Sequence, residues 1–179
     1  MSASRKPKCK GEFVNGFVAA VVEISPAFEQ QILDILAENG IENPAPQETY
    51  PANDVISSIS QLAEDVGPKT TSRIAVHQIR IPEWPREIDT VEKALFSIDD
   101  MYQDAYVDFN RRYMGEFRFE KTGNSEGRGA VTEEFPYPES FAEGIFKGSL
   151  TKFASQNSLP TVSETDTKTD EKAAYELRW

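Results

Sequence analysis

The sequence predicts an α+β fold, in which N-terminal helices pack on a small antiparallel sheet of two hairpins with a helix between them. Three observations support this class. Up to about residue 105, apolar residues recur at intervals of three and four, the period of amphipathic helices. Beyond Phe109 the period changes to two, as in half-buried strands. A helical period then returns before the last hairpin, so helices and strands are segregated along the chain.

The N-terminal part of the chain is expected to form five helices. Gly67-Pro68 ends the third of them, and Asp89 with Glu92 three residues later forms a capping-box pattern at the start of the fifth. Residues 43–51 contain three prolines and are expected to be a loop. The five helices are predicted over residues 11–24, 25–39, 52–66, 70–79 and 89–105.

The C-terminal part is expected to form the sheet. A strand is predicted over residues 117–120, followed by a flexible glycine-rich connection and a returning strand over 130–135. Two prolines at 136 and 138 introduce a helix that ends soon after Phe153. The last hairpin pairs residues 161–165 with 173–179 and directs Tyr175, Leu177 and Trp179 to one face.

Composition limits the classes of protein to consider. The 179 residues are 39% hydrophobic, enough for one folded domain, which is predicted over 10–179 after a flexible N-terminus over 1–9. The charge balance of 19 − 30 = −11 disfavours a nucleic-acid partner. One cysteine excludes an intrachain disulfide and a multi-cysteine zinc site. The longest apolar run, over 17–22, is too short for a membrane span, and residues 1–10 lack a signal-peptide pattern, so a cytoplasmic protein is expected.

Few side chains suggest chemistry on their own. His77 is the only histidine, hence the only imidazole for haem, for zinc or for acid–base catalysis, although a histidine resting at the edge of the core is the simpler interpretation. Four aspartates at positions 99, 100, 104 and 108 lack the glycine-turned loop typical of a cation site, so a solvated charged face is favoured. No metal site is therefore predicted. No catalytic residue is predicted either, because nucleophile and dinucleotide motifs are missing from the sequence.

The order of several motifs resembles the superfamily of haem–nitric-oxide/oxygen-binding (H-NOX)-like domains, which includes vinyl-reductase-like small-ligand domains. The resemblance spans about residues 10–179 and rests on an opening helix, a tyrosine-led third helix, the last helix and the final strand. These stretches are KGEFVNGFV at 10–18 with the following helix at 28–40, residues 50–67, YPESFAEGIFKG at 137–148, and YELRW at 175–179.

The resemblance implies that the standard haem ligand is missing. Haem-binding members carry a proximal histidine on the helix that corresponds to residues 90–106, where Met101 or Tyr102 stands nearest the expected place. The Tyr-Ser-Arg pattern that grips the haem propionates has no serine or arginine in the matching region, residues 132–137. No cofactor is therefore expected, unless His77 or Met101 substitutes as the haem ligand.

From this resemblance we expect a non-enzymatic sensory or ligand-binding module, haem-free, in a signalling context. A small apolar ligand would lie between helices and sheet, where the Tyr102 hydroxyl and the Met101 thioether orient it. Three alternatives remain: side chains that fill this interior, a protein-interaction module that docks a signalling partner or forms a homodimer, and a vinyl-reductase-like enzyme acting on a tetrapyrrole. The predicted pocket residues are Leu62, Ile98, Met101, Tyr102, Phe117 and Phe119.

Overall fold

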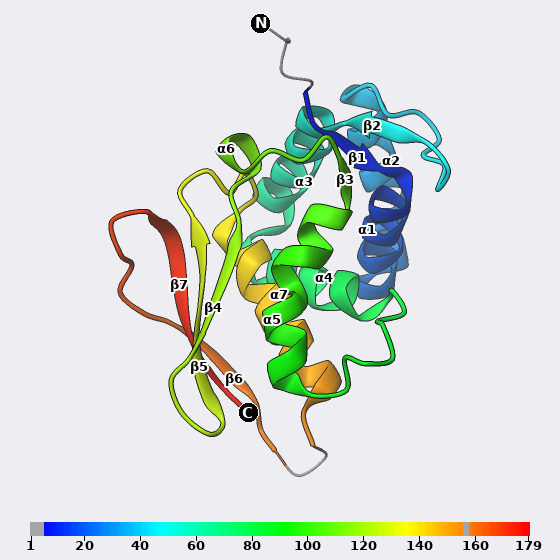
Figure 1. Ribbon diagram of the computed structural model, residues 1–179. Helices are drawn as coiled ribbons and strands as arrows, with labels where there is room; N and C mark the ends of the chain where they lie inside the picture. The colour runs from blue at the N-terminus through cyan, green and yellow to red at the C-terminus, as the bar shows by residue number, and fades with distance from the viewer. Residues whose placement is uncertain (1–5, 156–157) are drawn as a thin grey trace, which may run out of the picture.

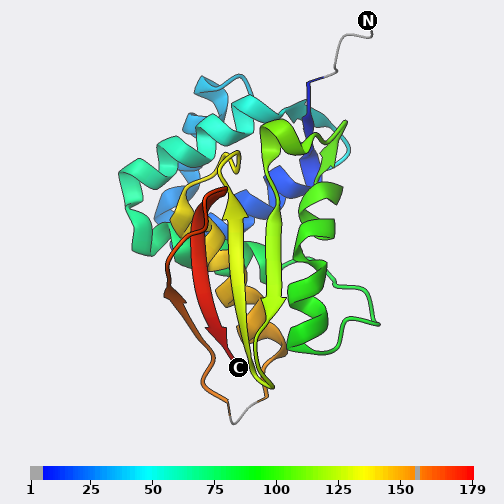
Figure 2. The same ribbon diagram turned by 60° about the vertical axis from the view of Figure 1, so that its left-hand side comes forward.

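The α+β class is confirmed by the computed structural model, which describes residues 6–155 and 158–179. The helices gather on one side of a four-stranded sheet, and a second, very small sheet lies at the end of the molecule where the described chain begins (Figure 1). Figure 2 shows the four-stranded sheet in front of the helices, with the helix that precedes its last hairpin directly behind it. This helix therefore lies between the four-stranded sheet and the other helices.

The helices largely follow the predicted bounds. Those of α1 and α3 agree with the prediction, while the second helix begins with a short 3-10 turn, η1, and the fourth is longer at both ends. The helical elements are α1 (Gly11–Ile24), η1 (Pro26–Phe28), α2 (Glu29–Glu38), α3 (Ala52–Val66), α4 (Pro68–Arg80), α5 (Val91–Asp104), α6 (Arg111–Met114) and α7 (Glu139–Phe153).

The start of α5 corrects the capping-box prediction. Thr90 is the N-cap residue, and its hydroxyl accepts a hydrogen bond from the Lys93 backbone N–H at 3.3 Å. Asp89 lies one residue earlier and instead accepts a hydrogen bond from the Lys93 ammonium at 2.7 Å. The carboxylate of Asp89 thus supports the helix as an ion-pair partner on its surface, and the cap itself is a threonine.

The larger sheet has the strand order β4-β5-β7-β6, with every pair antiparallel. Its strands are β4 (Phe117–Lys121), β5 (Glu126–Thr132), β6 (Thr161–Glu164) and β7 (Glu171–Arg178). The return strand therefore begins and ends several residues before the predicted 130–135. Gly127 and Gly129 lie in this strand and pair with β4 and β7. A Cβ at these positions would overlap the rings of Phe119 and Phe146, so both glycines permit close packing.

The smaller sheet was not predicted. Strand β1 (Lys8–Lys10) pairs on one side with β2 (Thr49–Pro51) and on the other with β3 (Tyr106–Val107). Lys8 and Cys9 were assigned to the flexible N-terminus, but they lie in β1, and the Cys9 side chain is completely buried. Residues 1–5 of that predicted segment lie outside the described residues. The loop predicted over 43–51 likewise ends in a strand.

Close backbone approach holds α7 between the sheet and α4. Gly144 and Gly148 face α4, where a Cβ would overlap the Ser72 carbonyl oxygen in the first case and the Ile79 side chain in the second. On the other side, Phe146 of α7 packs against Phe117 and Tyr175 of the sheet, with ring centroids 5.6 Å apart in both pairs. This helix therefore connects the sheet to the helical layer that carries the candidate site.

Within the described part of the chain, no helix is both long enough and apolar enough to cross a membrane.

Candidate functional site

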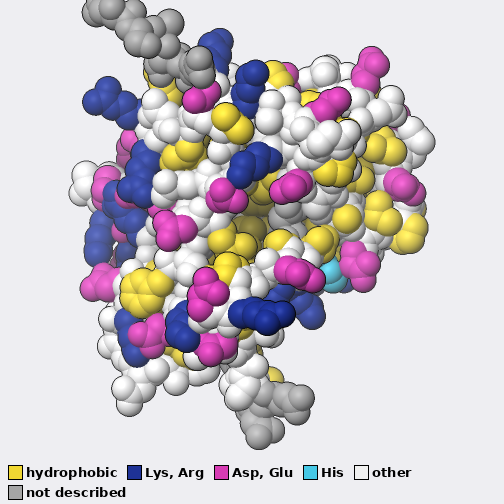
Figure 3. Space-filling view, turned by 45° about the vertical axis from the view of Figure 1, so that its right-hand side comes forward, with side chains coloured by type: hydrophobic (Ala, Val, Ile, Leu, Met, Phe, Trp, Pro, Cys, Tyr) yellow, Lys and Arg dark blue, Asp and Glu magenta, His cyan; other side chains and the backbone are white. Residues whose placement is uncertain are grey.

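A cavity of about 760 Å³ lies among α1, α4, α5 and the loop that follows α4. Its volume falls within the usual range for small-molecule sites, about 300–1,000 Å³. Figure 3 shows its mouth as a hollow with hydrophobic walls. The lining is mainly aliphatic and aromatic: Phe13, Ile79, Ile81, Ile88, Ile98, Met101, Tyr102, Phe117, Phe135, Tyr137, Phe141 and Ile145. The space between helices and sheet is therefore partly hollow.

A packed aromatic cluster forms the deep wall of this cavity. The Tyr102 ring stands edge-on to Phe117 at a centroid distance of 5.3 Å, and Phe117 in turn meets Phe135 at 5.0 Å. Tyr106 lies behind this wall, and its hydroxyl is hydrogen-bonded to that of Tyr137. Such contacts fix the rings in place. The rings of this wall are therefore held by contacts with one another.

The hydroxyls of these tyrosines are already engaged. Tyr102 donates to the Met114 carbonyl oxygen at 2.6 Å, so its proton is not free to orient a ligand, contrary to the prediction. Burial raises the pKa of Tyr102, Tyr106 and Tyr137 well above the usual tyrosine value. All three remain neutral phenols near neutral pH. The aromatic wall therefore presents carbon surface to a ligand and no phenolate.

Gln78 of α4 is a buried, uncharged polar residue of the lining. Its side-chain N–H donates to the Phe13 carbonyl oxygen at 3.2 Å, which fixes the orientation of the amide. Its oxygen, Oε1, is buried and has no hydrogen-bond partner, alone in this respect among the described residues. Only 7% of Gln78 is exposed. The unsatisfied oxygen is sealed within the protein, and Gly16 of α1 lies beside the amide nitrogen of Gln78, which a Cβ at this position would approach to 3.3 Å.

The mouth of the cavity is acidic. The charged residues of the lining are four carboxylates and one ammonium: Glu12, Glu83, Asp100, Asp104 and Lys10. Lys10 is paired with Asp104 at 2.9 Å. The other three carboxylates form no ion pair in the part of the chain that the structure describes. Acidic side chains are visible around the hollow in Figure 3.

The structure brings together four of the six predicted pocket residues. Ile98, Met101, Tyr102 and Phe117 all line the cavity. Leu62 is buried elsewhere in the core, and Phe119 packs between Phe96 and Trp179 towards the far end of the sheet, so neither belongs to the lining. Leu62 is buried and Phe119 is partly buried, but neither reaches the hollow part of the interior.

His77 lies outside this cavity. It lines a separate surface cleft between α4 and α7, together with residues of mixed charge such as Arg73, Lys147 and Glu143. The neighbouring residue, Gln78, faces the apolar cavity instead. Sequence reasoning missed Gln78, although a signal was present: it occupies the buried stripe of α4 with Ile74, Ala75 and Ile79, where an amide is unusual.

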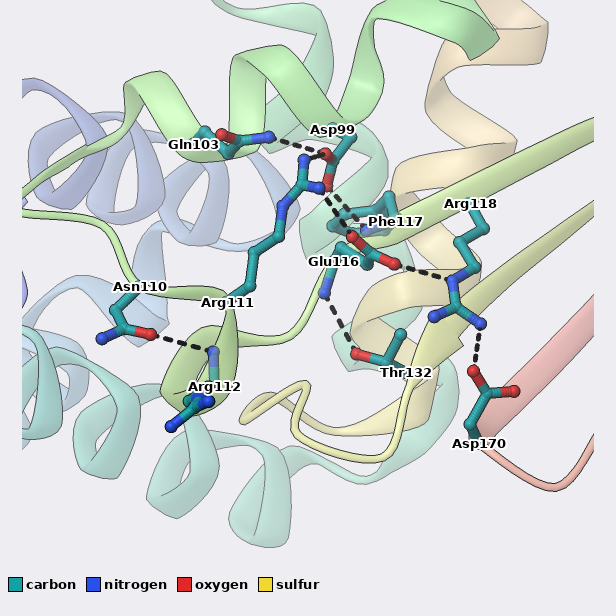
Figure 4. Close-up of polar contacts among 10 residues, drawn as sticks. All are labelled: Asp99, Gln103, Asn110, Arg111, Arg112, Glu116, Phe117, Arg118, Thr132 and Asp170. Atoms are coloured by element: carbon teal, nitrogen blue, oxygen red, sulfur yellow. Dashed lines mark hydrogen bonds and ion pairs between the residues drawn. The ribbon is translucent and has the colours of Figure 1, made fainter.

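Asp99 anchors the helix that carries Ile98 and Met101. Its carboxylate accepts hydrogen bonds from the side chains of Gln103 and Arg111 and from the backbone N–H of Phe117, at 2.7, 2.7 and 2.9 Å (Figure 4). The aspartate side chain is only 19% exposed. The prediction of a solvated charged face is therefore wrong for this residue, because its oxygens join α5 to α6 and β4.

A chain of ion pairs continues from Asp99 across the sheet. Arg111 also contacts Glu116 at 3.0 Å, Glu116 contacts Arg118 at 2.8 Å, and Arg118 contacts Asp170 at 2.6 Å (Figure 4). Arg111 belongs to α6, Glu116 immediately precedes β4, Arg118 lies in β4, and Asp170 lies in the turn before β7. Among the described residues, no group of three or more histidine, cysteine or acidic side chains is placed to hold a metal ion. The network is thus a structural connection between the cavity helix and the sheet.

No protein-family model and no curated protein sequence matches this chain significantly. Its fold, in contrast, matches solved structures over nearly the whole length. An oxygen-binding H-NOX domain related to soluble guanylate cyclases, in its oxygen complex, has a TM-score of 0.64 at 13% identity and covers 94% of this chain and 93% of its own. An H-NOX protein from S. oneidensis in the Fe(II) state has a TM-score of 0.64 at 14% identity, covering 94% and 95%.

A third structure, described for modulation of haem redox potential through porphyrin distortion, has a TM-score of 0.67 at 12% identity and covers 95% of this chain and 99% of its own. The class of domain is therefore defined: the chain has the fold of H-NOX domains. The resemblance drawn from the motifs is confirmed at the level of the fold.

The fold raises the question of haem, and the residues that line the cavity do not fit this group. Among the residues that the structure describes, the lining contains no imidazole and no arginine. Cys9 is buried behind the cavity, and burial raises the pKa of its thiol far above the usual value, so it offers no thiolate. Met101 is the one soft donor among the described residues of the lining, and methionine ligates haem in proteins together with a histidine. The three unpaired carboxylates at the mouth would repel the propionates.

Proposed function

We propose that this domain is a haem-free, non-enzymatic sensory module that binds a small, mostly apolar molecule in the cavity among α1, α4 and α5. The observation that carries the proposal is the hollow itself, about 760 Å³ behind hydrophobic walls whose tyrosine hydroxyls are already bonded within the protein. A rigid apolar cavity of this size gains affinity by burying ligand surface, at about 25 cal/mol per Å².

The position of the cavity supports a sensory role. Its wall includes Ile98 and Met101 of α5, and the adjacent Asp99 is bonded to α6 and β4. A ligand that shifts α5 would act on the sheet through these bonds. Signalling would then follow from a displaced helix, without chemistry at the site, and a partner protein or a second copy of the chain would read that displacement.

Two other functions receive less support from the structure. A pure interaction module with a filled core would not contain a hollow lined by Ile98, Met101 and Phe117. A vinyl-reductase-like enzyme would have to hold a tetrapyrrole, and the acidic mouth disfavours the carboxylates that tetrapyrroles carry. The ligand-binding module is therefore the function that we propose.

Filling the cavity tests this proposal. Ile98 is 2% exposed and lines the cavity, so the larger side chain of Ile98→Trp can extend into the hollow, and the variant should unfold within a few degrees of the natural sequence. Nile red, an uncharged apolar dye, should bind the natural protein with a rise in fluorescence. The same dye should lose most of its affinity for Ile98→Trp.

Leu62→Trp is the matched control, because Leu62 is 1% exposed and lies outside the cavity. Overpacking there should cost about 1–3 kcal/mol or more of unfolding free energy, measured by denaturant titration. A loss of stability in Ile98→Trp as large as that in Leu62→Trp would show that the site is filled. Absence of Nile red binding to the natural protein would equally contradict the proposal.

A further inference from the structure

We infer that the loop between α4 and α5, residues 81–90, is a lid that opens to admit a ligand to the cavity, and that Trp84 and Lys152 hold it closed. Figure 1 shows this lid loop as the irregular segment that leads from α4 to the start of α5. The inference rests on the proposed ligand-binding function and names the element that controls entry to that site.

The lid loop forms one side of the cavity and is exposed to solvent on its other side. Its lining residues are Ile81, Pro82, Glu83, Pro85 and Ile88. Ile81 is 48% exposed, whereas Ile98 of α5, which lines the same cavity, is 2% exposed. The lid loop is therefore a thin wall between the cavity and solvent, and α5 belongs to the packed interior.

The backbone of the lid loop is weakly held. Within the described part of the chain, residues 82–88 form a single backbone hydrogen bond, from the Ile88 N–H to the Pro85 carbonyl oxygen at 2.9 Å, and it lies inside the loop. Prolines 82 and 85 have no N–H to donate. Segments with so few backbone bonds are the ones that open locally at low cost. The loop can thus move without breaking any bond of a helix or strand.

Trp84 fastens the lid loop to the helices. Its side chain is not among the described residues that line the cavity. The ring instead packs edge-on against Phe153 of α7, with centroids 5.0 Å apart, and its Nε1–H donates to the Ile79 carbonyl oxygen at 3.0 Å. Trp84 therefore holds the loop in place from outside the cavity and does not shape the space that a ligand occupies.

Lys152 of α7 provides the second fastening. Its ammonium donates to the carbonyl oxygen of Arg80, the last residue of α4, at 2.9 Å and to that of Pro82 at 3.1 Å. The same ammonium lies 6.0 Å from the centroid of the Trp84 ring. One cation thus joins the end of α4, the lid loop and its tryptophan. Both fastenings come from the last turn of α7, so opening the lid separates the loop from that helix.

The rates of ligand binding test this inference. If a ligand enters and leaves only through the open lid, a change that favours the open lid raises the association and dissociation rates by the same factor, and Kd stays the same. Nile red rates are measured by stopped-flow mixing for association and by dilution of the complex for dissociation. Trp84→Ala should raise both rates about tenfold and Lys152→Met about threefold, with Kd changed by less than about twofold.

Two matched variants are the controls. Trp179→Ala removes the other tryptophan of the chain, which packs on Phe119 away from the cavity. Lys147→Met removes an exposed lysine of α7 that lies outside the cavity lining. Both should leave the two Nile red rates unchanged. The unfolding midpoint of every variant is recorded, and Lys152→Met decides the outcome if Trp84→Ala fails to fold.

The outcomes separate the lid from the proposed function. Absence of Nile red binding to the natural protein would show that the ligand-binding function itself is wrong. If Nile red binds and both rates are unchanged in Trp84→Ala and Lys152→Met, the lid is overturned and the binding function stands. If only the dissociation rate rises, so that Kd weakens by the same factor, the loop is a fixed wall of the site, which also overturns the lid.

Discussion

Glu171 at the start of β7 illustrates how single charged residues hold the sheet together. It is 7% exposed, and its carboxylate accepts two hydrogen bonds from the Arg128 guanidinium, at 2.7 and 2.5 Å, and one from the Lys168 backbone N–H at 2.7 Å. Hydrogen bonding to Arg128, opposed by burial, lowers the pKa of Glu171 to about 2. The pair therefore ties β5 to the turn before β7.

The lowered pKa predicts how stability depends on pH. A carboxyl whose pKa is lower in the folded state stabilises the protein above its unfolded pKa, here near 4.5, and this contribution is lost as the pH falls towards about 2. Glu171→Gln should therefore be about 1–3 kcal/mol less stable than the natural protein at pH 7. Denaturant titrations at several pH values should show this difference shrinking below pH 4.5. A difference that is the same at pH 7 and pH 3 would contradict the assignment.

Asp99 and Asp100 are adjacent aspartates with different surroundings. The Asp99 carboxylate accepts a hydrogen bond from the backbone N–H of Phe117, whereas Asp100 is exposed. Asp99→Ala leaves a partly buried N–H without its partner and should lower the unfolding free energy by about 1–3 kcal/mol. Asp100→Ala should change it by less than about 0.5 kcal/mol. Equal effects in chemical denaturation would mean that Asp99 does not anchor α5.

At the scale of elements, the helices were the most predictable part of the chain. In α3 the apolar residues Val55, Ile59 and Leu62 hold the helical period without interruption, and the predicted bounds are those observed. The strands β1, β2 and β3 have two or three residues each, too few to show a period of two. Their pairing depends on contacts between distant segments, such as Cys9 with Tyr50, which no local pattern records.

Glycines were the second limit on prediction. Glycines at 127 and 129 were interpreted as a flexible connection, yet they lie in β5 beneath the rings of Phe119 and Phe146. A glycine needed for a turn and one needed for close packing look alike in a single sequence. The distinction depends on which side chain lies above the glycine in the folded protein.

The same distinction predicts opposite effects for two helical glycines. Gly144→Ala should destabilise the protein by about 1–3 kcal/mol, because its Cβ would overlap the Ser72 carbonyl oxygen, and α4 and α7 would have to separate. Gly16→Ala should stabilise it by about 0.5–1 kcal/mol through helix propensity, because only the Gln78 side chain, at 3.3 Å, must move, and the cavity leaves room. Thermal unfolding of both variants is the measurement. Shifts of the same sign would disprove this reasoning.

The candidate site was predictable only in part. Ile98, Met101 and Tyr102 were recognised because the buried stripe of α5 had to face the sheet. The sequence could not show that the interior is divided, so Leu62 was placed in the same pocket although it packs elsewhere. His77 attracted attention as the only histidine, but a helix turns by about 100° per residue, and that rotation directs Gln78, one residue later, into the cavity instead.

At the scale of the whole molecule, the fold matches that of H-NOX domains, but the side chains that line the cavity do not fit haem. Nearly the entire chain superposes on H-NOX structures, including one described for its haem redox potential. The side chains that line the cavity are nonetheless those of an apolar site with an acidic mouth. The backbone arrangement matches that of H-NOX domains, whereas the described residues of the lining include no imidazole and no arginine. Overall shape is set by many distributed apolar contacts, whereas a cofactor site depends on a few particular side chains.

This contrast predicts the response of the protein to haemin. Because the lining provides no imidazole and places three unpaired carboxylates at the mouth, added haemin should bind weakly, without a sharp Soret band and without saturation at one equivalent. The measurement is an absorbance titration of the purified protein, with His77→Ala as a second sample. His77 lines the other cleft, so its removal should leave the spectra unchanged. A sharp stoichiometric Soret band that disappears in His77→Ala would instead make His77 the ligand and place haem at the surface cleft between α4 and α7.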